Sequence, residues 1–204
     1  MSASAGLRFR TAAAQDVEAI VGLHADSWRR HYRGAYSDAF LDGDVARYLL
    51  EMWATRLASP DPQASTILAE ADGAVVGIVH ALLGEDPRWG SLLDNLHVAY
   101  GLKRSGIGTR LMALTARAVL DWSPASGLYL WVLEQNVAAQ AFYEARGGAC
   151  VERAEDPPPG GDPANLNGQP MMLRYAWQDP SRLLGGDGRA ARRRSGNPRP
   201  VDGE

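Results

Sequence analysis

Apolar residues in the first third of the chain recur three and four positions apart. Residues 14–30 and residues 44–57 both show this spacing. Side chains at these intervals lie on one face of a helix, so the pattern predicts two amphipathic helices. A short alternating stretch at residues 7–10 predicts a strand before them.

Beyond residue 64 the pattern changes to strands. The stretches 65–71 and 74–83 are aliphatic and flank Asp72-Gly73, a dipeptide typical of a two-residue hairpin turn. A third strand is predicted at residues 91–98, and an amphipathic helix at about 107–122. Strict alternation along the third strand would divide its side chains into two sets: Leu92, Asp94, Leu96 and Val98 on one side, and Leu93, Asn95 and His97 on the other.

Four further elements follow. They are a buried strand at 128–133, a helix at 136–146, and closing strands at 148–153 and 170–177. Asn136 is a typical N-cap for this helix, and Gly147 is a typical residue to end it. A loop rich in Pro and Gly, residues 155–169, separates the closing strands. The order β-α-α-β-β-β-α-β-α-β-β predicts a mixed α/β sheet.

Composition and charge limit the classes of protein. The chain has 204 residues and no apolar run near the ~18 residues needed to cross a membrane, so one domain over residues 1–179 is expected. Residues 180–204 are rich in Arg, Gly and Pro, which predicts a disordered tail. The tail has a net charge of about +3 and the whole chain −3, which leaves about −6 on the domain. An acidic domain is not typical of a nucleic-acid-binding protein, so no nucleic-acid partner is expected.

The N-terminus and the cysteine content favour the cytoplasm. No apolar segment of signal-peptide type follows Met1, and Cys150 is the only cysteine, which excludes an internal disulfide. We expect Cys150 to be a packed small hydrophobic residue. His24 and His31 lack a third ligand in a metal-binding pattern, so they are expected to be core or surface residues and no metal is predicted.

The stretch "GLKRSGIGTRLM" (101–112) places a basic, glycine-containing loop between a predicted strand and a helix. Backbone N–H groups and the helix dipole converge at such a start, which is a typical site for a phosphate group. A P-loop would need Lys-Ser/Thr where Thr109-Arg110 stand, and the dinucleotide fingerprint would need glycine in place of Leu111. Considered alone, this loop is equally consistent with an anion-binding site and with a tight turn that binds no ligand.

In its context the loop resembles the central motif of the GCN5-related N-acetyltransferases, the GNAT superfamily. "LDNLHV" followed by "KRSGIGTRLM" matches the family's strand, its Gln/Arg-x-x-Gly-x-Gly/Ala loop and its helix, except that Lys103 stands where the family has Gln or Arg. "LYLWVLEQNVAAQAFYEARGG" is similar to the family's second motif. The likeness covers roughly residues 7–177. It implies a mixed, mostly antiparallel sheet, splayed at its fourth and fifth strands, with helices on both faces.

The resemblance also implies how acetyl-CoA binds. The backbone N–H of Val98 would contact the thioester carbonyl, with Leu96 and His97 beside the pantetheine arm. Asn136 would touch the pantetheine, and Tyr143, seven residues later on the same helix face, would protonate the coenzyme A sulfur. The pyrophosphate would lie on a loop made of Lys103, Arg104, Ser105, Gly106, Ile107, Gly108 and Thr109.

The general base is less well defined. Several family members place a glutamate early in strand 91–98, where this chain has Ser91 or Leu92. Asp94 is then favoured, because strict alternation puts it on the side of Val98. Glu134, His97 and a water molecule are the alternatives.

Residues 25–43 contain the candidate residues for binding the acceptor amine. Trp28, Tyr32 and Tyr36 recur every four residues and could line an aromatic wall for the acceptor, although ordinary packing gives the same spacing. Asp38 and Asp42, close to this wall in the sequence, could attract a cationic amine.

The predicted function is the transfer of an acetyl group from acetyl-CoA to a primary amine, by direct attack within a ternary complex. The acceptor is a small-molecule or peptide amine, and polyamine, antibiotic, amino acid and protein N-terminus all stay open. Many relatives pair, so a homodimer is an open question. Two alternatives are a non-catalytic acyl-CoA-binding sensor of the same fold and an RNA-associated protein that acts through the Arg-rich tail.

Overall fold

A computed structural model describes residues 6–185. Its sheet has seven strands in the order β1-β2-β3-β4-β5-β7-β6, and every neighbouring pair is antiparallel except β4 and β5. The strands are β1 (Arg8–Thr11), β2 (Ala64–Ala71), β3 (Ala74–Asp86), β4 (Gly90–Val98), β5 (Leu128–Leu133), β6 (Ala149–Glu155) and β7 (Met171–Trp177). The α-helices are α1 (Val17–His31), α2 (Val45–Ala58), α3 (Ile107–Trp122) and α4 (Val137–Glu144). None of the described helices is long and apolar enough to cross a membrane.

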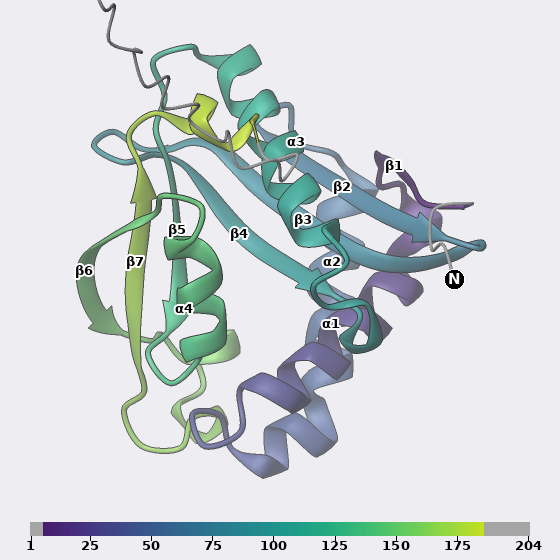
Figure 1. The fold of residues 1–204 in the computed structure, drawn as a ribbon. Coiled ribbons are helices and arrows are strands. Elements are labelled where there is room, and N and C mark those ends of the chain that lie inside the picture. The colour runs from purple at the N-terminus through teal and green to yellow at the C-terminus, as the bar shows by residue number, and fades with distance from the viewer. Residues whose placement is uncertain (1–5, 186–204) are drawn as a thin grey trace, which may run out of the picture.

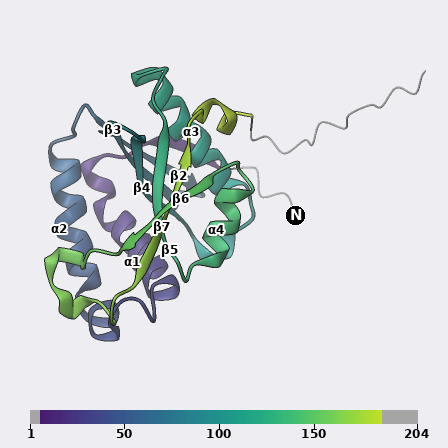
Figure 2. The same ribbon diagram turned by 90° about the vertical axis from the view of Figure 1, so that its left-hand side faces the viewer.

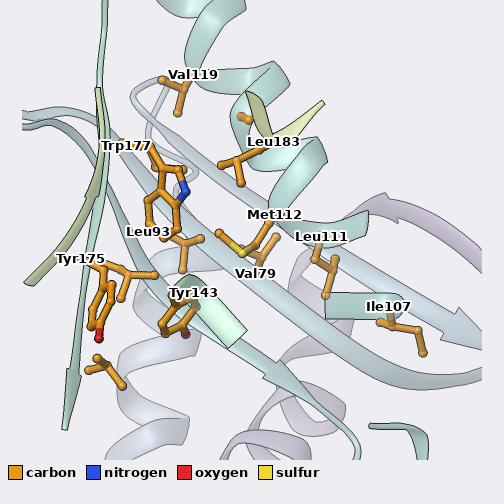
Figure 3. Close-up of a cluster of buried hydrophobic side chains, with 14 of the residues drawn as sticks. Val79, Leu93, Ile107, Leu111, Met112, Val119, Tyr143, Tyr175, Trp177 and Leu183 are labelled. Atoms are coloured by element: carbon orange, nitrogen blue, oxygen red, sulfur yellow. The ribbon is translucent and has the colours of Figure 1, made fainter. Parts of the chain in front are cut away.

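Helices cover both faces of the sheet, as predicted. α1 and α2 pack on one face, and α3 and α4 pack on the other (Figures 1 and 2). Each face has its own apolar core. The α3 side is built around Leu111, Met112 and Trp177 (Figure 3), and the α1–α2 side around Leu41, Leu49 and Trp53.

Local sequence signals set several boundaries. Asp72 and Gly73 both have left-handed backbone angles, φ 51° and 79°, as a two-residue turn between β2 and β3 requires. Asn136 caps α4, and its side chain accepts a hydrogen bond from the Ala139 N–H at 3.3 Å. The hairpin and the N-cap are therefore confirmed.

One expectation about packing is wrong. Cys150 is exposed, because β6 is the edge strand of the sheet and most of its residues face solvent. At the start of the segment that the sequence assigned to the tail, Pro180–Leu183 form a 3-10 helix, and Leu183 is buried against the α3-side core (Figure 3). The remainder of the predicted tail, residues 186–204, lies outside the described residues.

β4 does not alternate strictly, because it contains a β-bulge. Asn95 pairs with His80 and Leu93 pairs with Ala81, so Asp94 has no partner residue on β3. One extra residue in a strand reverses the sides of all that follow it. Leu93, Leu96 and Val98 consequently pack with the α3-side core, whereas Asp94 and His97 contact α2 and α1. The predicted grouping of Asp94 with Leu96 and Val98 is therefore wrong.

β4 and β5 separate soon after they begin. Their only pairs are Ser91 with Leu128 and Leu92 with Tyr129. Beyond these pairs, β4 continues to Val98 and β5 continues to Leu133, but the two strands no longer pair with each other. Their ribbons diverge in Figure 1. The splayed sheet that the family resemblance implied is confirmed.

Candidate active site

The start of α3 presents three free backbone donors. The N–H of Arg110 bonds to Gly106 O at 3.0 Å, whereas the N–H groups of Ile107, Gly108 and Thr109 have no acceptor within residues 6–185. These are the groups that every helix leaves unpaired at its N-terminus. Together with the helix dipole, these free N–H groups make the start of α3 suitable for an anion, near the end of the splayed strand β4.

Two glycines shape this turn in different ways. Gly106 caps α3 with φ 89°, a left-handed angle that L-residues rarely adopt. Gly108 has ordinary angles, but a Cβ there would lie 3.3 Å from the Phe142 ring, so the helix start approaches α4 closely. Arg104 in the same loop also takes a left-handed angle, φ 65°.

Arg146 is a cation beside this anion site that the sequence reading missed. Its Nε donates to Thr109 Oγ1 at 3.1 Å, and its Nη1 donates to Phe142 O at 2.8 Å. The guanidinium also lies over the Phe142 ring, 3.6 Å from the centroid. No carboxylate within residues 6–185 pairs with it, and burial lowers its pKa. Its spacing of four from Phe142 in the predicted helix 136–146 was the available signal, although α4 ends at Glu144 and Arg146 lies in the turn that follows.

Lys103, which the sequence placed in the same loop, turns towards α1 instead. Its Nζ lies 2.7 Å from His31 Nε2 and 5.2 Å from the centre of the Tyr100 ring. Burial lowers the pKa of Lys103, and the Lys103 charge contributes to a lowered pKa of His31.

The end of β4 offers a donor towards the gap between β4 and β5. Val98 pairs with Gly77, and the next residue, Ala99, donates its N–H to Val76 O at 2.9 Å. Donors alternate in direction along an antiparallel ladder, so the Val98 N–H points away from β3, towards the side of β5. This is the direction that contact with a thioester carbonyl in the gap requires.

Tyr143 lies on α4 among aromatic rings of β7. Its ring centre is 6.0 Å from that of Tyr175 and 6.2 Å from that of Trp177. Its hydroxyl points out of the cluster in Figure 3 and has no hydrogen-bond partner within the described chain. Burial raises its pKa, so the phenol keeps its proton at neutral pH. Asn136, at the start of the same helix, uses its Oδ1 for capping and keeps its amide N–H groups for other partners.

Each residue that was considered as the general base already has a partner. The Asp94 carboxylate pairs with Arg56 at 2.8 Å. Glu134 pairs with Arg153 at 2.8 Å, which lowers the pKa of Glu134. His97 shares a hydrogen bond of 2.9 Å with Ser27, and burial lowers its pKa to about 3, so it is neutral at pH 7. Their roles stay predictions.

Trp28, Tyr32 and Tyr36 form one aromatic cluster. Tyr32 stacks on Trp28 at 5.1 Å, and Tyr36 meets both rings edge to face. Trp28 and Tyr36 are buried, and Tyr32 is half-buried. The buried Trp28 Nε1 has no acceptor in the described chain. Packing and an acceptor wall are both consistent with this cluster.

The carboxylates near this cluster are not the ones expected. Asp38 and Asp42 both pair with Arg33, so neither is free to attract an amine. Asp156, which the sequence left inside a loop, is half-buried, and burial raises its pKa to about 6 against a smaller lowering effect of Tyr36. Its position just before three prolines, at the end of a strand, was the only sequence signal.

The sequence of this chain is similar to those of known acetyltransferases. A model of the Acetyltransferase (GNAT) family matches residues 25–148. A Mycobacterium tuberculosis protein named "Probable N-acetyltransferase Rv2775" is 28% identical over 144 residues, which are 69% of this chain and 78% of that protein.

Solved structures share the fold. The PaiA N-acetyltransferase of Thermoplasma acidophilum, in complex with coenzyme A, has a TM-score of 0.64 at 17% identity, over 87% of this chain and 100% of that one. A GCN5-related N-acetyltransferase of Rhodopseudomonas palustris has a TM-score of 0.64 at 18% identity, over 86% of this chain and 97% of that one.

Proposed function

We propose that this chain, which belongs to the acetyltransferase (GNAT) family, transfers the acetyl group of acetyl-CoA to a primary amine. The observation that carries the proposal is the set of free N–H groups of Ile107, Gly108 and Thr109 at the end of the splayed strand β4. They suit a pyrophosphate, and the Arg146 guanidinium beside them adds a positive charge. Bound there, acetyl-CoA supplies an activated acetyl thioester.

Residues of this chain then supply the groups that a direct attack of the amine on the thioester requires, in a ternary complex of protein, acetyl-CoA and amine. The Val98 N–H donates a hydrogen bond where negative charge develops on the carbonyl oxygen. Leu96 and His97 flank the pantetheine arm, and Asn136 donates to it. Tyr143 keeps its proton and gives it to the sulfur as the carbon–sulfur bond breaks. The attacking nitrogen loses its proton to the general base, for which Asp94 is the first candidate and Glu134, His97 and water are the alternatives. The acceptor enters past Trp28, Tyr32 and Tyr36.

Replacing Tyr143 by Phe tests this assignment. General acid catalysis typically contributes about 100-fold or more, so kcat should fall by about that factor while the KM for acetyl-CoA stays the same. The rate is measured as free thiol released from acetyl-CoA with a panel of amines. An unchanged kcat would remove Tyr143 from the mechanism.

The same panel separates an enzyme from a binding module. Calorimetric titration that shows tight acetyl-CoA binding, with no thiol released for any amine, would favour a non-catalytic acyl-CoA sensor. Cytoplasmic location, a homodimer and a disordered tail stay predictions from the sequence.

A further inference from the structure

Lys103 is the only lysine in the sequence, and every other side chain with a permanent positive charge is an arginine. The difference matters for chemistry. A lysine amine that has lost its proton is a nucleophile, whereas a guanidinium keeps its proton in proteins. The chain therefore has a single side-chain amine, and this amine lies in the loop before α3.

The amine of Lys103 lies against a neutral base. Its Nζ is 2.7 Å from Nε2 of His31, the last residue of α1. Lysine has only hydrogens to donate, so the imidazole nitrogen accepts this hydrogen bond and carries no proton of its own. Burial and the charges of Lys103 and Arg30 lower the pKa of His31, so the ring is neutral at pH 7. A neutral imidazole at this distance is placed to take a proton from Nζ.

The positive charge of Lys103 lacks a counter-charge. Arg30 and Lys103 both lie near the Tyr100 ring, with Arg30 Cζ at 4.8 Å and Lys103 Nζ at 5.2 Å from its centre. Asp26 pairs with Arg30 at 2.8 Å, whereas no carboxylate within residues 6–185 forms an ion pair with Lys103. Burial and the neighbouring Arg30 charge consequently lower the pKa of Lys103, which increases the share of neutral amine.

This Lys103–His31 pair lies at the open end of the gap between β4 and β5. Lys103 follows β4 after the 3-10 turn Tyr100–Leu102. On the other side Gln135, which follows β5, donates its Nε2 to His31 O at 3.3 Å and to Arg33 O at 2.9 Å. His31 is therefore held between segments that follow the two splayed strands. Lys103 is exposed, so a reagent from solution also reaches its amine.

We propose that Lys103 is a self-acetylation site, at which the side-chain amine takes the acetyl group of an acetyl thioester with His31 as its base. The neutral Nζ attacks the carbonyl carbon, a carbon–nitrogen bond forms, and the surplus proton passes to His31 Nε2. The carbon–sulfur bond then breaks, and the imidazolium returns the proton to the leaving thiolate. The products are acetyl-lysine and a free thiol, so the reaction needs no acceptor amine and no other reactant.

The test incubates the protein with acetyl-CoA at pH 8 in the absence of other amines. The only primary amines of the chain are Lys103 and the N-terminal amine, so peptide mapping by mass spectrometry assigns every acetyl group. Rates at Lys103 are divided by those at the N-terminal amine, which serves as the internal reference. We expect this ratio to be at least about 10-fold higher in the folded protein than in the same chain unfolded in urea.

Two variants test the role of the imidazole. His31→Gln keeps a hydrogen-bond acceptor but removes the base, so the ratio should fall about 10-fold or more. Arg33→Gln is the matched control at the same end of α1, and it should leave the ratio unchanged, because Arg33 pairs with Asp38 and Asp42. A ratio that is the same in the folded and unfolded chain, or the same in His31→Gln as in the wild type, would overturn the proposal.

Gly108→Val, which we expect to lose acetyl-CoA binding, identifies the donor. A slower reaction at Lys103 in this variant makes bound acetyl-CoA the donor, and an equal rate makes it acetyl-CoA from solution; Lys103 is the nucleophile in both cases. The outcome is separate from that of the proposed function. A protein that acetylates no added amine but gains an acetyl group at Lys103 would lose the proposed function and keep this site.

Discussion

Three buried histidines on the α1–α2 face should make this protein sensitive to mild acid. The His24 and His97 ring centres are 4.1 Å apart, and His80 lies on the same layer, where it shares a hydrogen bond of 2.8 Å with Thr66. Burial lowers the pKa of His24 well below its ordinary value, that of His97 to about 3 and that of His80 to about 4. His80 and His97 are therefore neutral in the folded protein at pH 5, and burial disfavours the charged form of His24 in the same way.

The unfolded chain differs, because its histidines titrate near pH 6.5. A group whose pKa is depressed by folding stabilises the fold above the unfolded pKa, and this contribution is lost as the pH falls below it. Between pH 8 and pH 5, His80 and His97 should each remove about 2 kcal/mol from the free energy of unfolding, or about 4 kcal/mol together, and His24 adds to this loss in the same direction.

Other groups change this total only slightly. The pKa of the Asp156 carboxyl is raised by folding, so its protonation favours the folded state in acid by about 1 kcal/mol. Carboxylates with lowered pKa values, such as Asp16 and Glu70, act mainly below pH 5. From His80 and His97 alone, the expected net loss is about 3 kcal/mol, which is a large part of the stability of a marginal domain.

Urea unfolding, followed by tryptophan fluorescence at pH 8, 7, 6 and 5, measures this loss. His97→Asn keeps a polar atom near Ser27 and removes the titrating ring, so the loss between pH 8 and pH 5 should shrink by about 2 kcal/mol whatever the stability at pH 8. His31→Asn is the control and should shrink it less, because His31 is only half-buried. A pH-independent stability, or the same loss in His97→Asn as in the wild type, would refute the reasoning.

Two further predictions concern the anion site at the start of α3. Gly108→Val should abolish measurable acetyl-CoA binding while the fold persists, because the valine side chain would crowd the Phe142 ring and cover the free N–H groups. Lys103→Ala should leave the acetyl-CoA affinity within about tenfold of the wild type. Calorimetry checks both, and equal affinities for pantetheine and coenzyme A would show that the loop holds no pyrophosphate. Arg146→Met keeps the packing on Phe142 but removes the charge, so coenzyme A should bind about 10-fold more weakly, with pantetheine unchanged. An unaltered coenzyme A affinity would rule out a role for this cation.

The features that local sequence predicted are those that short-range physics decides. Helix and strand periods identified the elements, the Asp72-Gly73 turn followed from left-handed backbone angles, and Asn136 capped the helix it precedes. The glycines of the loop before α3 predicted a helix start with free N–H groups in the same way. In each case the residues that determine the structure are close neighbours in the chain, and their conformational preferences act without the rest of the fold.

Tertiary structure alone decided the rest. The bulge at Asp94, which reversed the sides of β4, depends on the register with β3, and no period in residues 91–98 reveals it. Cys150 is exposed because β6 is an edge strand, a property of the strand order. Arg146 and Lys103 look like ordinary surface charges in the sequence. Only packing brings one to Thr109 and the other to His31, because the contacts of a charged group come from segments far apart in the chain.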